Sequence, residues 1–180
     1  EFILMLLIIG LFAAIAPLSA SKKRAATQKI LADKLASLKF AVSSVLPLGE
    51  MALYTDEVHG KWFVRMSRTD TDPVIYPYSA LTGFELLDSG NVIASASAGH
   101  IPEEAFVRGR KSELANTGDC SSLLLVLRPG EDRTDKINVP LISAPVPRFS
   151  RGYRAALSEA KAAVNELLKI MASPEEERAV

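Results

Sequence analysis

Hydrophobic and polar positions change pattern three times along this chain of 180 residues, and the first stretch is almost wholly apolar. No residue from Phe2 to Ser21 is charged, and the apolar residues would cover every face of a helix. About 20 helical residues cross the roughly 30 Å hydrocarbon core of a bilayer. Burial inside a soluble domain is the alternative, but a domain this small has too little interior to surround such a helix. Residues 1–21 are therefore predicted to form a transmembrane helix.

A cleaved secretory signal peptide is a second alternative for this apolar stretch. Its end offers poor cleavage sites, because Pro17 follows the Ala14-Ile15-Ala16 pattern and Ser19-Ala20-Ser21 fits the small-residue rule weakly. A retained single span is therefore the interpretation that the residues favour.

The next stretch has the spacing of an amphipathic helix. Five apolar residues within 25–46 follow a 4-3-4-3 spacing, which is typical of the a and d positions of a coiled coil. They are Leu31, Leu35, Leu38, Val42 and Val45. A connector lying on its own domain or on the bilayer, a self-associating helix, and packing on another membrane protein all remain open. Pro47 and Gly49 are expected to end the helix, so residues 22–48 are predicted to be a basic helical stalk.

From Met51 the pattern changes to short runs with strand periodicity, separated by turns. In one of them Trp62 and Val64 fall on one face, while Lys61 and Arg65 fall on the other. Seven runs are predicted to be strands: Met51–Tyr54, Lys61–Met66, Val74–Tyr78, Leu81–Leu87, Val92–Ala96, Ser121–Leu127 and Lys136–Ile142.

The end of the chain returns to helical periodicity. Arg151–Ala172 has one apolar stripe and one charged face, with Ser150 as a suitable N-cap. A single amphipathic helix after several antiparallel strands is expected to cover the face of the sheet that the strands cannot bury alone. Residues 173–180 are predicted to be a solvated acidic tail.

The order of the predicted elements, seven short strands and then one helix, is that of a known small domain. Several stretches support this: the Asp56-Glu57 turn before a strand, the step Tyr78-Ser79-Ala80-Leu81 into Phe84–Gly90, the isolated Cys120 before an apolar strand, and the helix from Tyr153 to Leu168. Residues 49–172 thus resemble the bacterial pleckstrin-homology-like (PH-like) domains.

The resemblance implies an α+β, mainly β fold, in which a bent seven-stranded antiparallel sheet or barrel is closed by a C-terminal helix. It also implies a small scaffold that binds protein or lipid, with no catalytic residues to carry over. Members of this family often have a cysteine-rich zinc ribbon upstream. Here the predicted span and stalk occupy that place, so no zinc role is expected.

Composition and charge narrow the class of protein further. The chain has 21 basic and 21 acidic residues, which argues against general nucleic-acid binding, and its single cysteine excludes a disulfide framework. The stretch 22–46, directly after the predicted span, has six basic residues and one acid. The positive-inside rule places that end in the cytoplasm. We therefore predict an inner (cytoplasmic) membrane protein whose soluble domain is cytoplasmic.

The sequence carries no recognised motif for catalysis or cofactor binding. The sequence contains no GxxxxGK[ST], GxGxxG, GxSxG or HExxH pattern. His59 and His100 are isolated on predicted turns, and nothing in the sequence positions either beside Cys120. Because Cys120 flanks an apolar strand, a buried and inert thiol is expected. We predict that the protein is not an enzyme and binds no cofactor or metal.

Candidate contact residues fall in three places: the basic start of the stalk, the first hairpin, and the loop Ser97–Ser121, which is long for a small β domain. Basic residues at the first hairpin are where PH domains bind phosphoinositides. A solvated sheet face is the alternative for the hairpin, and disorder is the alternative for the loop. The candidates are Lys22, Lys23, Arg24, Lys61, Arg65, Arg68, Phe106, Arg108, Arg110 and Lys111.

The sequence thus predicts a non-catalytic, single-pass membrane accessory or scaffolding subunit. Its partners would be the bilayer and a larger membrane protein complex, bound through the span and the cytoplasmic PH-like domain. The alternative is a membrane-surface adaptor that binds anionic lipids through its basic residues. A third possibility, a hydrolase or redox enzyme, lacks a constellation of residues to support it.

Overall fold

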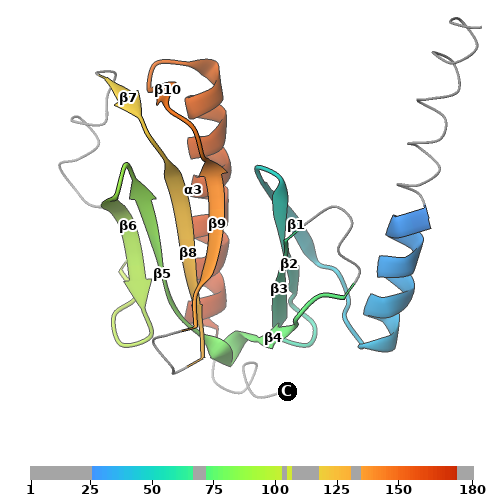
Figure 1. Ribbon diagram of the computed structural model, residues 1–180. Helices are drawn as coiled ribbons and strands as arrows, with labels where there is room; N and C mark the ends of the chain where they lie inside the picture. Colours follow the sequence, from blue (N-terminus) through green and yellow to red (C-terminus); the bar gives the residue numbers. More distant parts are fainter. Residues whose placement is uncertain (1–25, 67–71, 103–104, 107–117, 131–134, 174–180) are drawn as a thin grey trace, which may run out of the picture. The chain divides into compact units, whose positions relative to one another are not determined.

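The computed structural model describes residues 26–66, 72–102, 105–106, 118–130 and 135–173 (Figure 1). Its contacts divide the chain into two units, residues 1–40 and 41–180. The predicted transmembrane helix of residues 1–21 lies outside the described residues, as does most of the predicted acidic tail. Within the described residues, no helix combines the length and the apolar character needed to cross a membrane.

In the first unit the described residues form one helix, over residues 26–37. The helix ends in a Schellman motif, in which the Phe40 amide donates to the Leu35 carbonyl at 2.9 Å and the Lys39 amide to the Ala36 carbonyl at 3.1 Å. Lys39 adopts the left-handed conformation, with φ 51°. That position usually carries glycine, so the sequence offered no signal for the stop.

The predicted stalk helix is therefore wrong beyond residue 37. Strand β1 (Ser44–Leu48) occupies the end of the stretch for which a helix was expected. The spacing of Val42 and Val45 fits a helix, but Leu46 and Leu48, two positions apart, fit the alternation of a strand with one buried face. Residues 44–48 form a strand because they pair with β2. The helical spacing of the preceding apolar residues carries no information about that pairing.

In the second unit the first sheet is an antiparallel meander. Its order is β1-β2-β3-β4, with β2 (Met51–Asp56), β3 (Lys61–Arg65) and β4 (Tyr76–Pro77). Leu53 of β2 lies opposite Leu46 on one side and Val64 on the other. The turns before β2 and β3 place Gly49 and Gly60 at positive φ, which glycine adopts without steric cost.

The second sheet has the order β6-β5-β8-β9, so β5 is a central strand. Its strands are β5 (Leu81–Asp88), β6 (Asn91–Ser97), β8 (Leu123–Pro129) and β9 (Ile137–Ile142). A 3₁₀ turn, η1 (Tyr78–Ala80), leads into β5. A third, two-stranded sheet joins β7 (Asp119–Cys120) to β10 (Val146–Pro147).

Helix α3 (Arg151–Ala172) lies against one face of the second sheet (Figure 1). The prediction for this helix is confirmed, including its cap: the Ser150 hydroxyl accepts the Tyr153 amide at 3.1 Å. Trp62, Phe84, Leu86, Leu125 and Leu167 are among the fully buried side chains of the core. The core thus combines the inner faces of both larger sheets with the apolar stripe of α3.

The expected fold class is wrong in the number of strands and in their division into sheets. Instead of one bent seven-stranded sheet, the described residues form ten strands in three sheets. The predicted run Val74–Tyr78 contains β4, but β1 was expected to be helical, and β7 and β10 have only two residues each, too few to produce a visible alternation. The pairing of β5 with β8 joins residues about 40 positions apart, and no local pattern contains that information.

Candidate functional site

The richest polar cluster surrounds Asp88, the last residue of β5. Its carboxylate is completely buried and accepts two hydrogen bonds from Arg148, at 2.6 Å from Nη2 and 3.2 Å from Nε. The Tyr153 hydroxyl donates to Oδ2 at 2.8 Å, and the Ser89 hydroxyl donates to Oδ1 at 2.9 Å. The cluster therefore ties the end of β5 to the first turn of α3 and to the segment between β10 and α3.

Opposing effects set the charge of this cluster. Burial acts to raise the pKa of Asp88, but hydrogen bonds from Arg148, Tyr153 and Ser89 outweigh it and lower that pKa below its usual value. Burial, and the hydrogen bond to Asp88, raise the pKa of Tyr153. At neutral pH Asp88 and Arg148 are therefore both charged and form an ion pair, and Tyr153 is protonated.

Cys120 lies beside this cluster and is buried. Its Sγ donates to the Ser122 carbonyl oxygen at 3.2 Å. Burial raises the pKa of the Cys120 thiol, and the nearby Asp88 carboxylate raises it further. Because the thiolate is the nucleophilic form, the arrangement suppresses reactivity.

A second cluster surrounds Asp56, the last residue of β2. Its buried carboxylate accepts the amides of Ala41, Val58 and His59 at 2.8, 3.0 and 3.0 Å, and contacts His59 Nδ1 at 2.8 Å. Burial acts to raise the pKa of Asp56, but the bonds from Ala41 and His59 lower it below its ordinary value. His59 lies on a turn, as predicted, but its side chain is not isolated, and an aspartate three positions earlier was the available signal.

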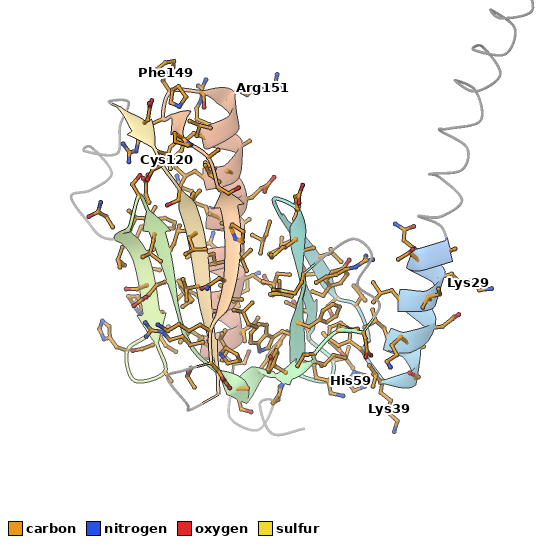
Figure 2. All side chains as sticks on the ribbon, in the orientation of Figure 1. Lys29, Lys39, His59, Cys120, Phe149 and Arg151 are labelled. Carbon is orange, nitrogen blue, oxygen red and sulfur yellow. The ribbon has the colours of Figure 1, made fainter. Side chains whose placement is uncertain are left out.

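The two clusters lie in different parts of the domain. Figure 2 shows Cys120 near the start of α3 and His59 far from it, so these two side chains do not form a nucleophile pair. Within the described residues, no group of three or more His, Cys, Asp or Glu side chains could hold a metal ion. Both carboxylates have their hydrogen-bonding capacity met by the protein itself, which is the arrangement of a structural support.

The predicted basic contacts of the first hairpin are partly described. Lys61 and Arg65 lie at the two ends of β3, on the same face as Phe63, and both are half-buried. Trp62 is in the core on the opposite face, as predicted, and its Nε1 donates to the Pro77 carbonyl at 3.1 Å. The other predicted contact residues, Lys22, Lys23, Arg24, Arg68, Arg108, Arg110 and Lys111, lie outside the described residues.

Phe106, the remaining predicted contact, uses part of its ring to pack against the core. It forms a bridge with Ala94 of β6, the Ser95 amide donates to the Ala105 carbonyl at 3.1 Å, and Lys161 Nζ lies 5.9 Å from the ring centre. On the other side of residues 107–117, the Arg148 amide donates to the Gly118 carbonyl at 3.2 Å. The described residues on both sides of that segment are thus attached to the domain.

Sequence reasoning missed Asp88, Arg148 and Tyr153 as a group. They are separated by 60 and 65 positions from Asp88, so only the folded chain brings them together. Comparisons of the chain with protein-family models, curated proteins and solved structures find no match. The resemblance to the PH-like family accordingly stays a prediction.

Proposed function

We propose that this protein is a non-catalytic accessory or scaffolding subunit, attached to a membrane through its apolar N-terminal stretch and bound to a larger membrane protein complex. The stretch from Phe2 to Ser21, followed at once by Lys22, Lys23 and Arg24, supports membrane attachment. The carboxylates of Asp88 and Asp56 support the non-catalytic assignment, because both accept hydrogen bonds that connect elements of the domain to one another.

The observation that carries the binding role is the attachment of both flanks of residues 107–117. Phe106 packs against the core before this segment, and Gly118 is bonded to Arg148 after it. The segment contains Arg108, Arg110 and Lys111. A basic segment with both flanks attached to a firm domain loses less entropy on binding than a free tail does, which favours a role in partner contact.

A native pull-down of the full-length chain in mild detergent, with mass spectrometry of the co-eluting proteins, tests this proposal. A stoichiometric membrane partner is expected. The triple variant Arg108→Ala, Arg110→Ala and Lys111→Ala should reduce its recovery at least about tenfold, because charged contacts steer and stabilise association. The control removes three exposed charges elsewhere, by Lys136→Ala, Arg151→Ala and Arg154→Ala, and should retain the partner.

Equal loss in the two triple variants would contradict a role for the 107–117 segment. Recovery of the wild-type chain without a partner would contradict the accessory-subunit proposal as a whole. That outcome would favour the second candidate, an adaptor for anionic lipids. Lys61 and Arg65, which share one face of β3, support this candidate.

A further inference from the structure

The second sheet has one face covered by α3 and one face that α3 leaves open (Figure 1). On the covered face, Leu86 of β5 lies opposite Leu125 of β8, which lies opposite Val139 of β9, and all three are fully buried. Because successive side chains of a strand point to opposite faces, their neighbours in the sequence belong to the other face. We call that other side the open sheet face.

An apolar row crosses the open sheet face on all four strands. Leu87 of β5 lies opposite Val92 of β6 and opposite Leu124 of β8, and Leu124 lies opposite Pro140 of β9. The two leucines and Val92 are half-buried, and Pro140 is exposed. Polar residues are the rule on the solvated face of an antiparallel sheet, so a four-strand apolar row indicates a surface that is covered in use.

Within the four strands of the sheet, all of whose residues are described, the charges on the open sheet face are balanced. Glu85 of β5 and Arg128 of β8 are paired there at 2.7 Å, and each side chain is about one third exposed, at 31% and 34%. The neighbours of Glu85 across the sheet, Ser95 and Val126, are uncharged. An anionic lipid surface would need a basic surplus, which the described residues of these four strands do not provide.

We propose that the open sheet face is the site where two copies of this chain associate, sheet against sheet. A twofold axis brings a surface patch against itself, so the patch must be self-complementary. A patch with charges of one sign would repel its copy, whereas Glu85 beside Arg128 allows each acid to face the other copy's base. Aligned sheets packed about 10 Å apart would enclose the two apolar rows between them. This inference does not depend on membrane attachment.

The experiment uses the full chain in mild detergent, with two different affinity tags on separately expressed copies. Wild-type copies should exchange and co-purify, with a protein mass twice that of one chain. Glu85→Arg leaves two bases on the face, and Arg128→Glu leaves two acids, so each variant alone should self-associate at least about tenfold more weakly. A mixture of the two variants should pair again, because the bases of one face the acids of the other.

The rescue by mixing separates an interface from a structural effect, since a misfolded variant would not regain its partner. Val58→Arg, at a side chain that is 74% exposed and far from this sheet in sequence, is the charge control and should associate like the wild type. Circular dichroism and urea midpoints of the variants confirm folding. A monomeric wild-type chain, single variants that pair normally, a mixture that fails to pair, or a foreign protein bound at this face would each overturn the proposal.

Discussion

Asp88 is the central residue of the buried polar cluster of the domain. Its side chain has no exposed surface, and it pairs with Arg148, whose side chain is 15% exposed. A buried ion pair contributes little net stability compared with an apolar pair, but removal of one partner leaves the other charge without compensation. Because the Arg148 guanidinium lies largely inside the domain, loss of the Asp88 carboxylate is expected to destabilise the fold.

Asp88→Asn is therefore expected to lower the free energy of unfolding by about 3 kcal/mol, since it removes the buried negative charge that pairs with the Arg148 guanidinium. The measurement is urea unfolding followed by circular dichroism. Glu85→Gln is the matched control, because it breaks an ion pair that is one third exposed and should cost less than about 1 kcal/mol. Equal losses in the two variants would show that the Asp88 cluster is not a structural support.

The same residue predicts a dependence on pH. The pKa of an unfolded aspartate is about 3.9, and the pKa of folded Asp88 lies lower. As the pH falls, the unfolded chain binds its proton first, so the stabilisation from Asp88 is complete above about pH 5 and is lost as the pH falls through the folded value. Asp88→Asn should therefore flatten the acid limb of the stability curve, as measured by urea unfolding at a series of pH values.

At the scale of elements, the approach of β5 to β6 depends on a glycine. A Cβ atom at Gly83 would lie 2.8 Å from the Ala96 carbonyl oxygen, an atom of the β6 backbone that cannot move independently of the strand. Thr82 strengthens the same corner, because its hydroxyl contacts the Arg128 and Gly130 carbonyls at 3.0 and 2.9 Å. The corner where β5 begins is thus fixed on both neighbouring strands.

Gly83→Ala is expected to destabilise the protein by about 1–3 kcal/mol, although alanine in a strand interior is otherwise favoured over glycine. Urea unfolding gives the magnitude. Gly99→Ala provides the control, since a Cβ atom there meets no atom within 4 Å and should leave stability almost unchanged. A neutral Gly83→Ala variant would mean that β6 shifts freely at this point, contrary to the observed register.

At the scale of the whole molecule, the main hydrophobic cluster lies in the second unit. Its buried members, from Leu48 to Met171, and the partly buried residues that pack on them all lie within residues 41–180. The Asp56 carboxylate binds the Ala41 amide, so this unit also includes the first residue after the boundary. The interactions needed for a cooperative domain are therefore present without residues 1–40.

A fragment of residues 41–180 is accordingly expected to fold alone, with one cooperative urea transition and an m-value of about 1–3 kcal/mol/M. A fragment of residues 58–180 is the control. It lacks β1 and β2, and with them the buried Leu48 and Leu53, so it should not unfold cooperatively. A broad transition for the 41–180 fragment would show that residues before Ala41 complete the core.

Local periodicity predicted several elements well. The bounds of α3 and its Ser150 cap were read correctly, because both depend on residues within one or two helical turns. The inward placement of Trp62 followed from the alternation of one strand. The end of the first helix at residue 37 was missed, because Lys39 provides a rare non-glycine stop. Strands β7 and β10 were missed because two residues are too few to alternate.

The sequence by itself determined which stretches have helical or strand periodicity, where the charges lie, and that the N-terminal stretch is apolar. Only the tertiary structure decided that β5 pairs with β8, that Arg148 meets Asp88, and that Leu87 and Leu124 lie side by side on an open face. The physical reason is the distance along the chain over which each interaction acts. Backbone geometry imposes its period on neighbouring residues, whereas strand pairing and buried ion pairs depend on a free energy summed over residues far apart in the chain.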